Sequence, residues 1–326
     1  MLSFIKHIGM KRHGLPNFIC VGFGKSGTTS LHYALRDHPD VCLPKMKEAH
    51  FFDVDETYAK GLVFYRRNFF SHCSNKKVIG DITPAYVTKP EALKRIRKDL
   101  GRGVKIVVIL RHPVIRAFSH YIHAVRLFED IHPFCDTSGN IRDLYRECSG
   151  YSKLLSLLFD LFPKENVLPL IFERDIEAHG TNVAYKKVCE FLGIKYDGTG
   201  KPDALANTGY LPRVTLLDSP KKTTVQGKEV RFDAGQLVAE HVRKPEGYSV
   251  QIIEGISGDA LLSYANFGES ITRTLDRQTI RRLEDSIFKD DIKAAKKLLS
   301  DSIPEWNLDN LNIPYYEMVE SRLVDI

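Results

Sequence analysis

The chain has no long apolar run and no closely spaced pair of cysteines. None of its apolar stretches approaches the roughly 20 residues of a membrane-spanning helix, and the segment Met1–His7 lacks the apolar core of a signal peptide. The six cysteines are scattered, at positions 20, 42, 73, 135, 148 and 189, which is typical neither of a zinc site nor of a disulfide framework. We therefore expect no membrane span, reduced thiols and a cytoplasmic location, with a Cys135–Cys148 bridge as the one pairing left open.

Motifs of several other functional classes are also missing. There is no Gly-x-Ser-x-Gly segment of the kind that carries the nucleophile of a serine hydrolase. His120 and His123 have helical spacing, but no suitable cluster of Asp, Glu or Cys completes a metal site around them. The net charge of +6 is modest, and the basic residues within 90–100 are typical of the solvated face of a helix. The sequence thus predicts neither a metal nor a nucleic-acid partner.

What the chain does contain is an alternation of two kinds of apolar segment. Short continuous runs indicate buried parallel strands at 18–22, 78–81, 104–110 and 167–172. Helical spacing is found at 28–36, 56–70, 90–100, 113–127, 151–162, 183–192, 279–288 and 291–299. This order predicts an α/β fold of three layers, with a central parallel sheet flanked by helices. We expect a single domain over 1–326, with a core of 15–210 and 271–310 and an insertion or lid at 213–270, where the periodicity is lost.

The segment Phe18–Leu31 is the most informative part of the chain. An apolar run ends at a pair of glycines, Lys25 follows, and a hydroxyl-rich helix start comes next. Backbone N–H groups at such a turn, together with the helix dipole, form an anion site. A Walker A loop has a further glycine five residues before Gly24, where this chain has Ile19. The loop is therefore P-loop-like but shorter than that of a nucleotide triphosphatase.

A second candidate anion site follows the strand at 104–110. Arg111 stands at the carboxyl end of that strand, which is where open α/β sheets bind their ligands. Ser119 follows two turns into the next helix and adds a hydroxyl to the forked donor of the arginine. Two anion sites on neighbouring strand ends indicate a ligand with two separated anionic groups.

These segments resemble the sulfotransferase superfamily that uses 3′-phosphoadenosine 5′-phosphosulfate (PAPS), nearest the branch of heparan sulfate sulfotransferases and related bacterial enzymes. The resemblance covers about 1–210 and 271–310. The motifs that carry it are Lys25–Thr29, the Arg111…Ser119 pair, Lys47–Phe52, Gly80–Tyr86 and Leu275–Trp306.

The resemblance implies a role for each matching residue. Lys25 would neutralise charge on the bridging oxygen of the phosphosulfate, and Arg111 with Ser119 would hold the 3′-phosphate. Glu48 would be the general base, with His50 as the second candidate because another branch uses histidine there. The 5′-phosphate would be bound by the residues of the loop and helix start: Gly24, Lys25, Ser26, Gly27, Thr28 and Thr29.

The implied activity is transfer of a sulfuryl group from PAPS to a hydroxyl, or secondarily an amine, of a small-molecule or carbohydrate acceptor. PAP would be the co-product, and no metal is implied. The heparan-modifying enzymes have a lysine where this chain has Ile82, and the segment 213–270 has no counterpart in them. Two other hypotheses stay open: a P-loop small-molecule kinase, with Asp81 as its magnesium ligand, and a nucleotide-binding module without catalysis.

Overall fold

The computed structural model describes residues 14–198, 210–225, 227–243, 247–254, 267–319 and 323–325. The chain divides into two compact units, which are described separately. Unit 1 comprises Met1–His112, Gly150–Asp203 and Asp291–Glu305. Unit 2 comprises Pro113–Ser149, Ala204–Asp290 and Trp306–Ile326.

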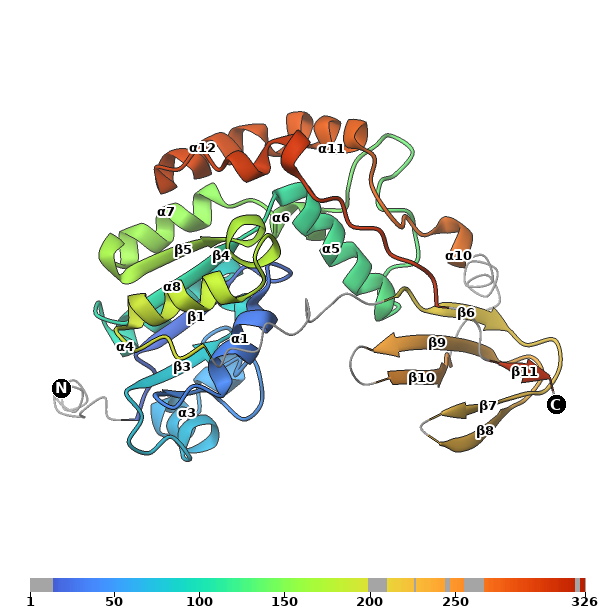
Figure 1. Ribbon diagram of the computed structural model, residues 1–326, viewed down its shortest axis with the longest axis horizontal. Coiled ribbons are helices and arrows are strands. Elements are labelled where there is room, and N and C mark those ends of the chain that lie inside the picture. The colour runs from blue at the N-terminus through green and yellow to red at the C-terminus, as the bar shows by residue number, and fades with distance from the viewer. Residues whose placement is uncertain are drawn as a thin grey trace. The chain divides into compact units, whose positions relative to one another are not determined.

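Unit 1 contains a five-stranded parallel sheet in the order β2-β3-β1-β4-β5 (Figure 1). Its strands are β1 (Phe18–Gly22), β2 (Val41–Cys42), β3 (Val78–Ile82), β4 (Lys105–Leu110) and β5 (Val167–Ile171). β1, β3 and nearly all of β4 are buried on both faces, which explains their continuous apolar runs. The predicted α/β class with a central parallel sheet flanked by helices is confirmed.

Helices flank this sheet, and a large apolar cluster joins β1 and β4 to α1 and α8, which pack against each other. α4 and α7 also pack together. The helices of unit 1 are α1 (Thr28–Arg36), α2 (Asp55–Tyr58), α3 (Gly61–Phe70), α4 (Pro90–Leu100), α7 (Ser152–Leu161), α8 (Asn182–Leu192) and, from Asp291 on, α12 (Lys289–Leu299). Shorter helical turns are η1 (Pro84–Thr88), η2 (Lys164–Asn166), η3 (Glu173–Glu177) and η5 (Pro304–Trp306).

The helix expected at 56–70 is in fact two helices, α2 and α3. The break falls at Gly61, whose φ of +79° lies in the left-handed region that glycine adopts without strain. The helix predicted at 28–36 coincides with α1, and the one predicted at 183–192 ends, as expected, before Gly193, whose φ is +66°.

Unit 2 combines helices with two antiparallel sheets. The sheets have the orders β10-β9-β6 and β11-β7-β8. The strands are β6 (Arg213–Leu216), β7 (Lys221–Val225), β8 (Lys228–Phe232), β9 (Leu237–Arg243), β10 (Gly247–Ile252) and β11 (Val324–Asp325). The helices and turns are α5 (Pro113–Arg126), α6 (Asp143–Glu147), α10 (Phe267–Ser270), α11 (Arg277–Leu283), η4 (Glu284–Phe288) and η6 (Leu308–Asn310). The described residues of the segment 213–270, where we expected no regular pattern, therefore carry five strands.

The expectation of reduced thiols throughout the chain is wrong. Cys42, at the end of β2, and Cys73, just after α3, form a disulfide with a Cα–Cα distance of 5.6 Å. Cys135 and Cys148, the pairing left open, are both free. Cys42, Cys73 and the adjacent His72 are also the one group of three close metal-ligand side chains within the described ranges, but both sulfurs are bonded to each other.

Candidate functional site

The register of the sheet brings the carboxyl ends of β1, β3 and β4 to one edge. Cys20 pairs with Ile82 of β3 and with Val107 of β4. The hydrogen bonding between β1 and β3 continues past the last residue of β3, because Thr83 N donates to Cys20 O over 3.1 Å. Most candidate site residues of unit 1 lie in the segments that directly follow these three strands. The remaining ones lie within 47–53, a segment that is hydrogen-bonded to the residues after β3.

The turn between β1 and α1 depends on glycine at two positions. A Cβ at Gly22 would lie 2.5 Å from Pro84 O, so this residue must lack a side chain for β1 to approach the segment after β3. At Gly27 φ is +89°, and a Cβ would lie 2.7 Å from Ile176 and 2.9 Å from Phe172. The close approach of the helix start to the turn after β5 thus requires glycine as well.

Arg111 extends from the end of β4 to this turn. Its Nη1 donates to Lys25 O over 3.2 Å, and its Cζ lies 4.3 Å from the centre of the Phe172 ring. Arg111 Nε and Ser26 Oγ are buried, and within the described part of the chain neither has a hydrogen-bond partner. Buried polar groups without partners are uncommon in folded proteins, and at this position they are suited to an anionic ligand.

The structure places the other predicted donor-binding residues as follows. Gly24 and Lys25 are partly exposed in the turn, and Lys25 has a φ of +66°. Thr28 and Thr29 form the first turn of α1 and are buried and partly exposed, respectively. Ser119 is buried on α5, which belongs to unit 2, so its pairing with Arg111 stays a prediction.

Both candidate bases lie on a short segment before α2 with unusual backbone geometry. Glu48 and His50 have φ values of +65° and +46°, in the left-handed region that is costly for side chains other than glycine. Their side chains are 29% and 45% exposed, so both are accessible to an acceptor. Glu48 Oε2 lies 3.5 Å from His50 Nε2, and Lys47 Nζ donates to Glu48 Oε1.

Asp53 is a residue that sequence reasoning missed. Its Oδ2 lies 2.9 Å from His50 Nδ1, and its side chain is only 3% exposed. The other oxygen, Oδ1, is buried and has no partner within the described ranges. Asp53 therefore orients His50, whose opposite nitrogen faces Glu48. The only sequence signal was an aspartate three residues after the histidine.

A buried network below this segment fixes its backbone. Ala49 N donates to Thr83 Oγ1 over 3.0 Å, and Phe51 N donates to Tyr86 OH over 3.1 Å. Both hydroxyls donate in turn to Asp81, over 2.7 and 2.8 Å. These bonds stabilise the strained conformation of the segment, because a buried hydrogen-bond network whose members are all satisfied is rigid.

Asp81 itself is fully buried and is bonded on both oxygens. Its Oδ2 also accepts from Tyr65 OH over 2.5 Å. Burial raises the pKa of Asp81, although the three hydroxyl donors act in the opposite direction. Burial also raises the pKa of Tyr65 and Tyr86 well above the usual value. Since its oxygens are occupied by hydroxyls, Asp81 is a structural residue and does not present the free carboxylate that the kinase hypothesis requires.

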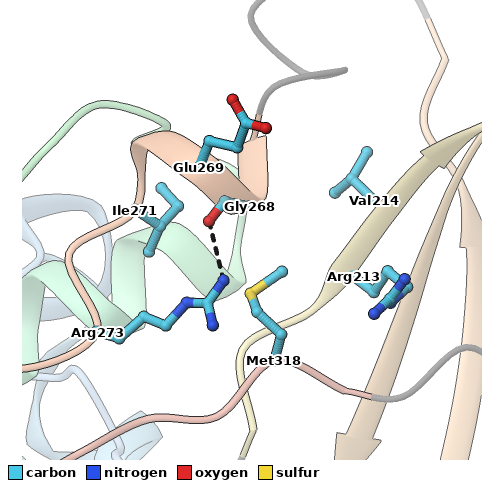
Figure 2. A pocket seen from close by; sticks show the side chains of 7 residues that line it. All are labelled: Arg213, Val214, Gly268, Glu269, Ile271, Arg273 and Met318. Carbon is cyan, nitrogen blue, oxygen red and sulfur yellow. Dashed lines mark hydrogen bonds between the residues drawn. The ribbon is translucent and has the colours of Figure 1, made fainter.

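Unit 2 has a pocket of about 560 Å³ (Figure 2). Arg273 Nη2 donates across its wall to Gly268 O over 3.1 Å, and Arg213 Nε donates to Val319 O over 3.1 Å. Part of the segment 213–270 thus forms a pocket wall, while its role as an insertion or lid stays a prediction. The lining residues are Arg213, Val214, Gly268, Glu269, Ile271, Arg273 and Met318.

Comparison with a solved structure identifies the fold. The chain superposes on the crystal structure of a sulfotransferase from Alicyclobacillus acidocaldarius with a TM-score of 0.55 and 21% sequence identity, over 89% of this chain and 98% of that one. A family model described as sulfotransferase domain matches residues 15–213, which is more than half of the 326 residues. The chain belongs to this sulfotransferase family. Membership implies a sulfonate donor as co-substrate, together with an acceptor.

Two curated relatives are similar in sequence. The membrane-associated sulfotransferase kil1 of Dictyostelium discoideum is 38% identical over 114 residues, which are 34% of this chain and 24% of that protein. Human heparan sulfate glucosamine 3-O-sulfotransferase 3B1 is 32% identical over 250 residues, 74% of this chain and 62% of that enzyme. The chain thus spans less than two thirds of the length of either relative.

The predicted cytoplasmic location is wrong. The similar proteins are named as membrane-associated and as heparan sulfate sulfotransferases. The Cys42–Cys73 disulfide also argues against the cytoplasmic location, because such bonds persist mainly in oxidising compartments. None of the helices in the described ranges combines the length and the apolar character that crossing a bilayer requires.

Proposed function

We propose that this protein is a PAPS-dependent sulfotransferase that transfers a sulfuryl group to a hydroxyl of a carbohydrate acceptor. The observation that carries the proposal is the contact between the two anion segments, which are the turn at Gly24–Thr29 and the end of β4 at Arg111. Arg111 Nη1 lies 3.2 Å from Lys25 O, beside buried polar atoms that have no hydrogen-bond partner in the described part of the chain. A nucleotide with phosphates at both its 5′ and 3′ ends is the donor that such a pair suits. Transfer to a carbohydrate is supported by the names of the heparan sulfate relatives.

In this proposal the donor is held by the turn after β1 and by the end of β4. The loop residues Gly24–Thr29 bind the 5′-phosphate, and Arg111 with Ser119 binds the 3′-phosphate. Lys25 stabilises the negative charge that develops on the bridging oxygen as the bond from sulfur to that oxygen breaks. Ser26 Oγ and Arg111 Nε, which are buried and have no hydrogen-bond partner among the residues that the structure describes, support this assignment.

The acceptor hydroxyl attacks sulfur in line with the leaving phosphate oxygen. A new S–O bond forms, PAP leaves, and the hydroxyl proton passes to Glu48 or, as the second candidate, His50. General base catalysis of this kind typically contributes a factor of about 100 to 10,000. The exposure of both side chains and their mutual approach of 3.5 Å support a shared role in which one accepts the proton and the other stabilises it.

We further propose that residues 1–326 act as one sulfotransferase domain with 213–270 inserted into it. The family model ends at residue 213, where β6 begins, and this boundary supports the division. The kinase alternative is not favoured, because Asp81 is buried under three hydroxyl donors.

The test is to measure thermal stabilisation by PAP and transfer from sulfur-labelled PAPS to heparan-type oligosaccharides. We expect PAP to raise the melting temperature and label to appear on the acceptor without magnesium. Lys25→Ala should abolish transfer. Stabilisation by ATP with magnesium but not by PAP would contradict the proposal, and PAP binding without transfer to any hydroxylated acceptor would favour a module without catalysis.

A further inference from the structure

Two aromatic side chains in unit 1 each contact both anion segments. The first is Tyr151, at the start of α7, which is fully buried. Its ring packs edge-on against Phe23 in the turn after β1, with 4.6 Å between ring centres. Its hydroxyl donates to Arg111 O over 2.6 Å. One rigid side chain therefore fixes the turn that carries Lys25 relative to the backbone of Arg111.

Tyr151 is itself held firmly from the opposite side. Its backbone N–H donates to Asp291 Oδ2 over 2.6 Å, and Ser152 N and Oγ donate to Asp291 Oδ1 over 2.9 and 2.5 Å. A charged acceptor that receives three hydrogen bonds at a helix start is a strong anchor. The position of the Tyr151 ring is thus set independently of any bound ligand.

The second aromatic side chain is Phe172, which follows β5. Its ring lies below the guanidinium of Arg111, 4.3 Å from Cζ, and its edge is so near Gly27 that a Cβ there would approach to 2.9 Å. The next residue, Glu173, accepts from His112 N over 2.8 Å. Phe172 therefore orients the arginine head, while Glu173 and Tyr151 hold the backbone on either side of the same peptide.

We infer that Tyr151 and Phe172 are positioning residues that set the span between the 5′ and 3′ anion subsites, and so determine selectivity for a nucleotide phosphorylated at both ends. This inference rests on the proposed function. Neither residue needs to touch the nucleotide. Their effect is to fix Arg111 at one distance and orientation from the Lys25 turn, which lowers the cost of ordering both segments when the ligand binds.

The experiment compares two ligands that differ only in the 3′-phosphate, PAP and adenosine 5′-phosphate, by titration calorimetry on the full chain. We expect the wild type to prefer PAP. Tyr151→Phe keeps the ring on Phe23 but removes the bond to Arg111 O, and should reduce that preference about 3- to 10-fold. Phe172→Leu removes the cation–π contact and should reduce it by a similar factor of about 3 to 10. The affinity for adenosine 5′-phosphate should change little in either variant.

Tyr185→Phe is the matched control. Tyr185 is also fully buried, and its hydroxyl donates to Asp197 Oδ1 over 2.5 Å, but its partners His38 and Tyr196 belong to neither anion segment. The control should leave the preference for PAP unchanged. An unchanged preference in Tyr151→Phe, or an equal loss of affinity for both ligands, would overturn the inference while the proposed function stands. A wild type that does not prefer PAP would instead contradict the proposed function.

Discussion

His50 Nδ1 lies 2.9 Å from Asp53 Oδ2, and this contact determines which nitrogen of the imidazole faces the candidate base. Because a carboxylate accepts, Nδ1 donates to Asp53 and Nε2 is turned to the side of Glu48, 3.5 Å from Oε2. Two proton acceptors thus stand side by side on an accessible segment. The arrangement is suited to removing a proton from a hydroxyl and then sharing it between them.

Asp53→Asn tests this orientation. The amide lacks the charge of the carboxylate, and its NH2 group can take the place of the accepting oxygen, so the imidazole is held less firmly in the orientation that turns Nε2 toward Glu48. We expect kcat to fall by roughly a hundredfold, as for a misplaced catalytic group, while the affinity for PAP stays unchanged. Steady-state kinetics and calorimetry measure the two quantities. Wild-type kcat in this variant would show that His50 takes no part in the reaction.

Glu48→Gln and His50→Gln distinguish the two candidate bases. We expect Glu48→Gln to lower kcat by about 100- to 10,000-fold, the usual contribution of a general base, and His50→Gln to lower it less. Both variants should bind PAP as the wild type does, because neither residue is assigned to the donor. The reverse order of the two kcat values would transfer the role of base to His50.

The disulfide gives a prediction about stability. Cys42 and Cys73 are 31 residues apart, and closing a loop of this length stabilises the folded state by about 4 kcal/mol in the chain-entropy account. A Cys42→Ser, Cys73→Ser double variant should lose this amount from its free energy of unfolding, measured by denaturant titration. The free energy of unfolding of the reduced wild type should equal that of the double variant, which should itself be the same with and without reductant. Equal stability of the oxidised wild type and the variant would refute the prediction.

The main features of unit 1 could be predicted from the sequence because its signals are local. A strand buried on both faces reads as a continuous apolar run, and β4 shows this clearly. The approach of Arg111 to the Lys25 turn follows from a general rule, since neighbouring parallel strands end at the same edge of a sheet. Strand order and the identity of the loops then bring the two anion segments together.

Other features depend on tertiary placement and left little trace in the sequence. Cys42 and Cys73 meet only because β2 lies beside the end of α3. The strands of 213–252 are short and partly exposed, and threonine and lysine break the apolar alternation in β7, so no period stands out. Asp53 acts through the left-handed backbone of His50, and no spacing rule anticipates such a turn.

His32 gives a prediction about pH dependence. It is buried on α1, and burial, with a further contribution from the charges of Lys47 and Arg36, lowers its pKa to about 4. The unfolded chain binds a proton near pH 6.5, so between about pH 6.5 and 4 the unfolded state holds more protons at this residue than the folded state. Stability should therefore fall as the pH falls through this window, and recover as it rises.

The measurement is the free energy of unfolding of the wild type and of His32→Gln at pH 7 and pH 4. Carboxylates contribute to the acid loss in both proteins, so the difference between them isolates His32. We expect the wild type to lose up to about 3 kcal/mol more than the variant. The same substitution at the exposed His179 is the matched control and should behave as the wild type. Parallel losses in wild type and His32→Gln would contradict the prediction, because they would mean that the pKa of His32 does not differ between the folded and the unfolded chain.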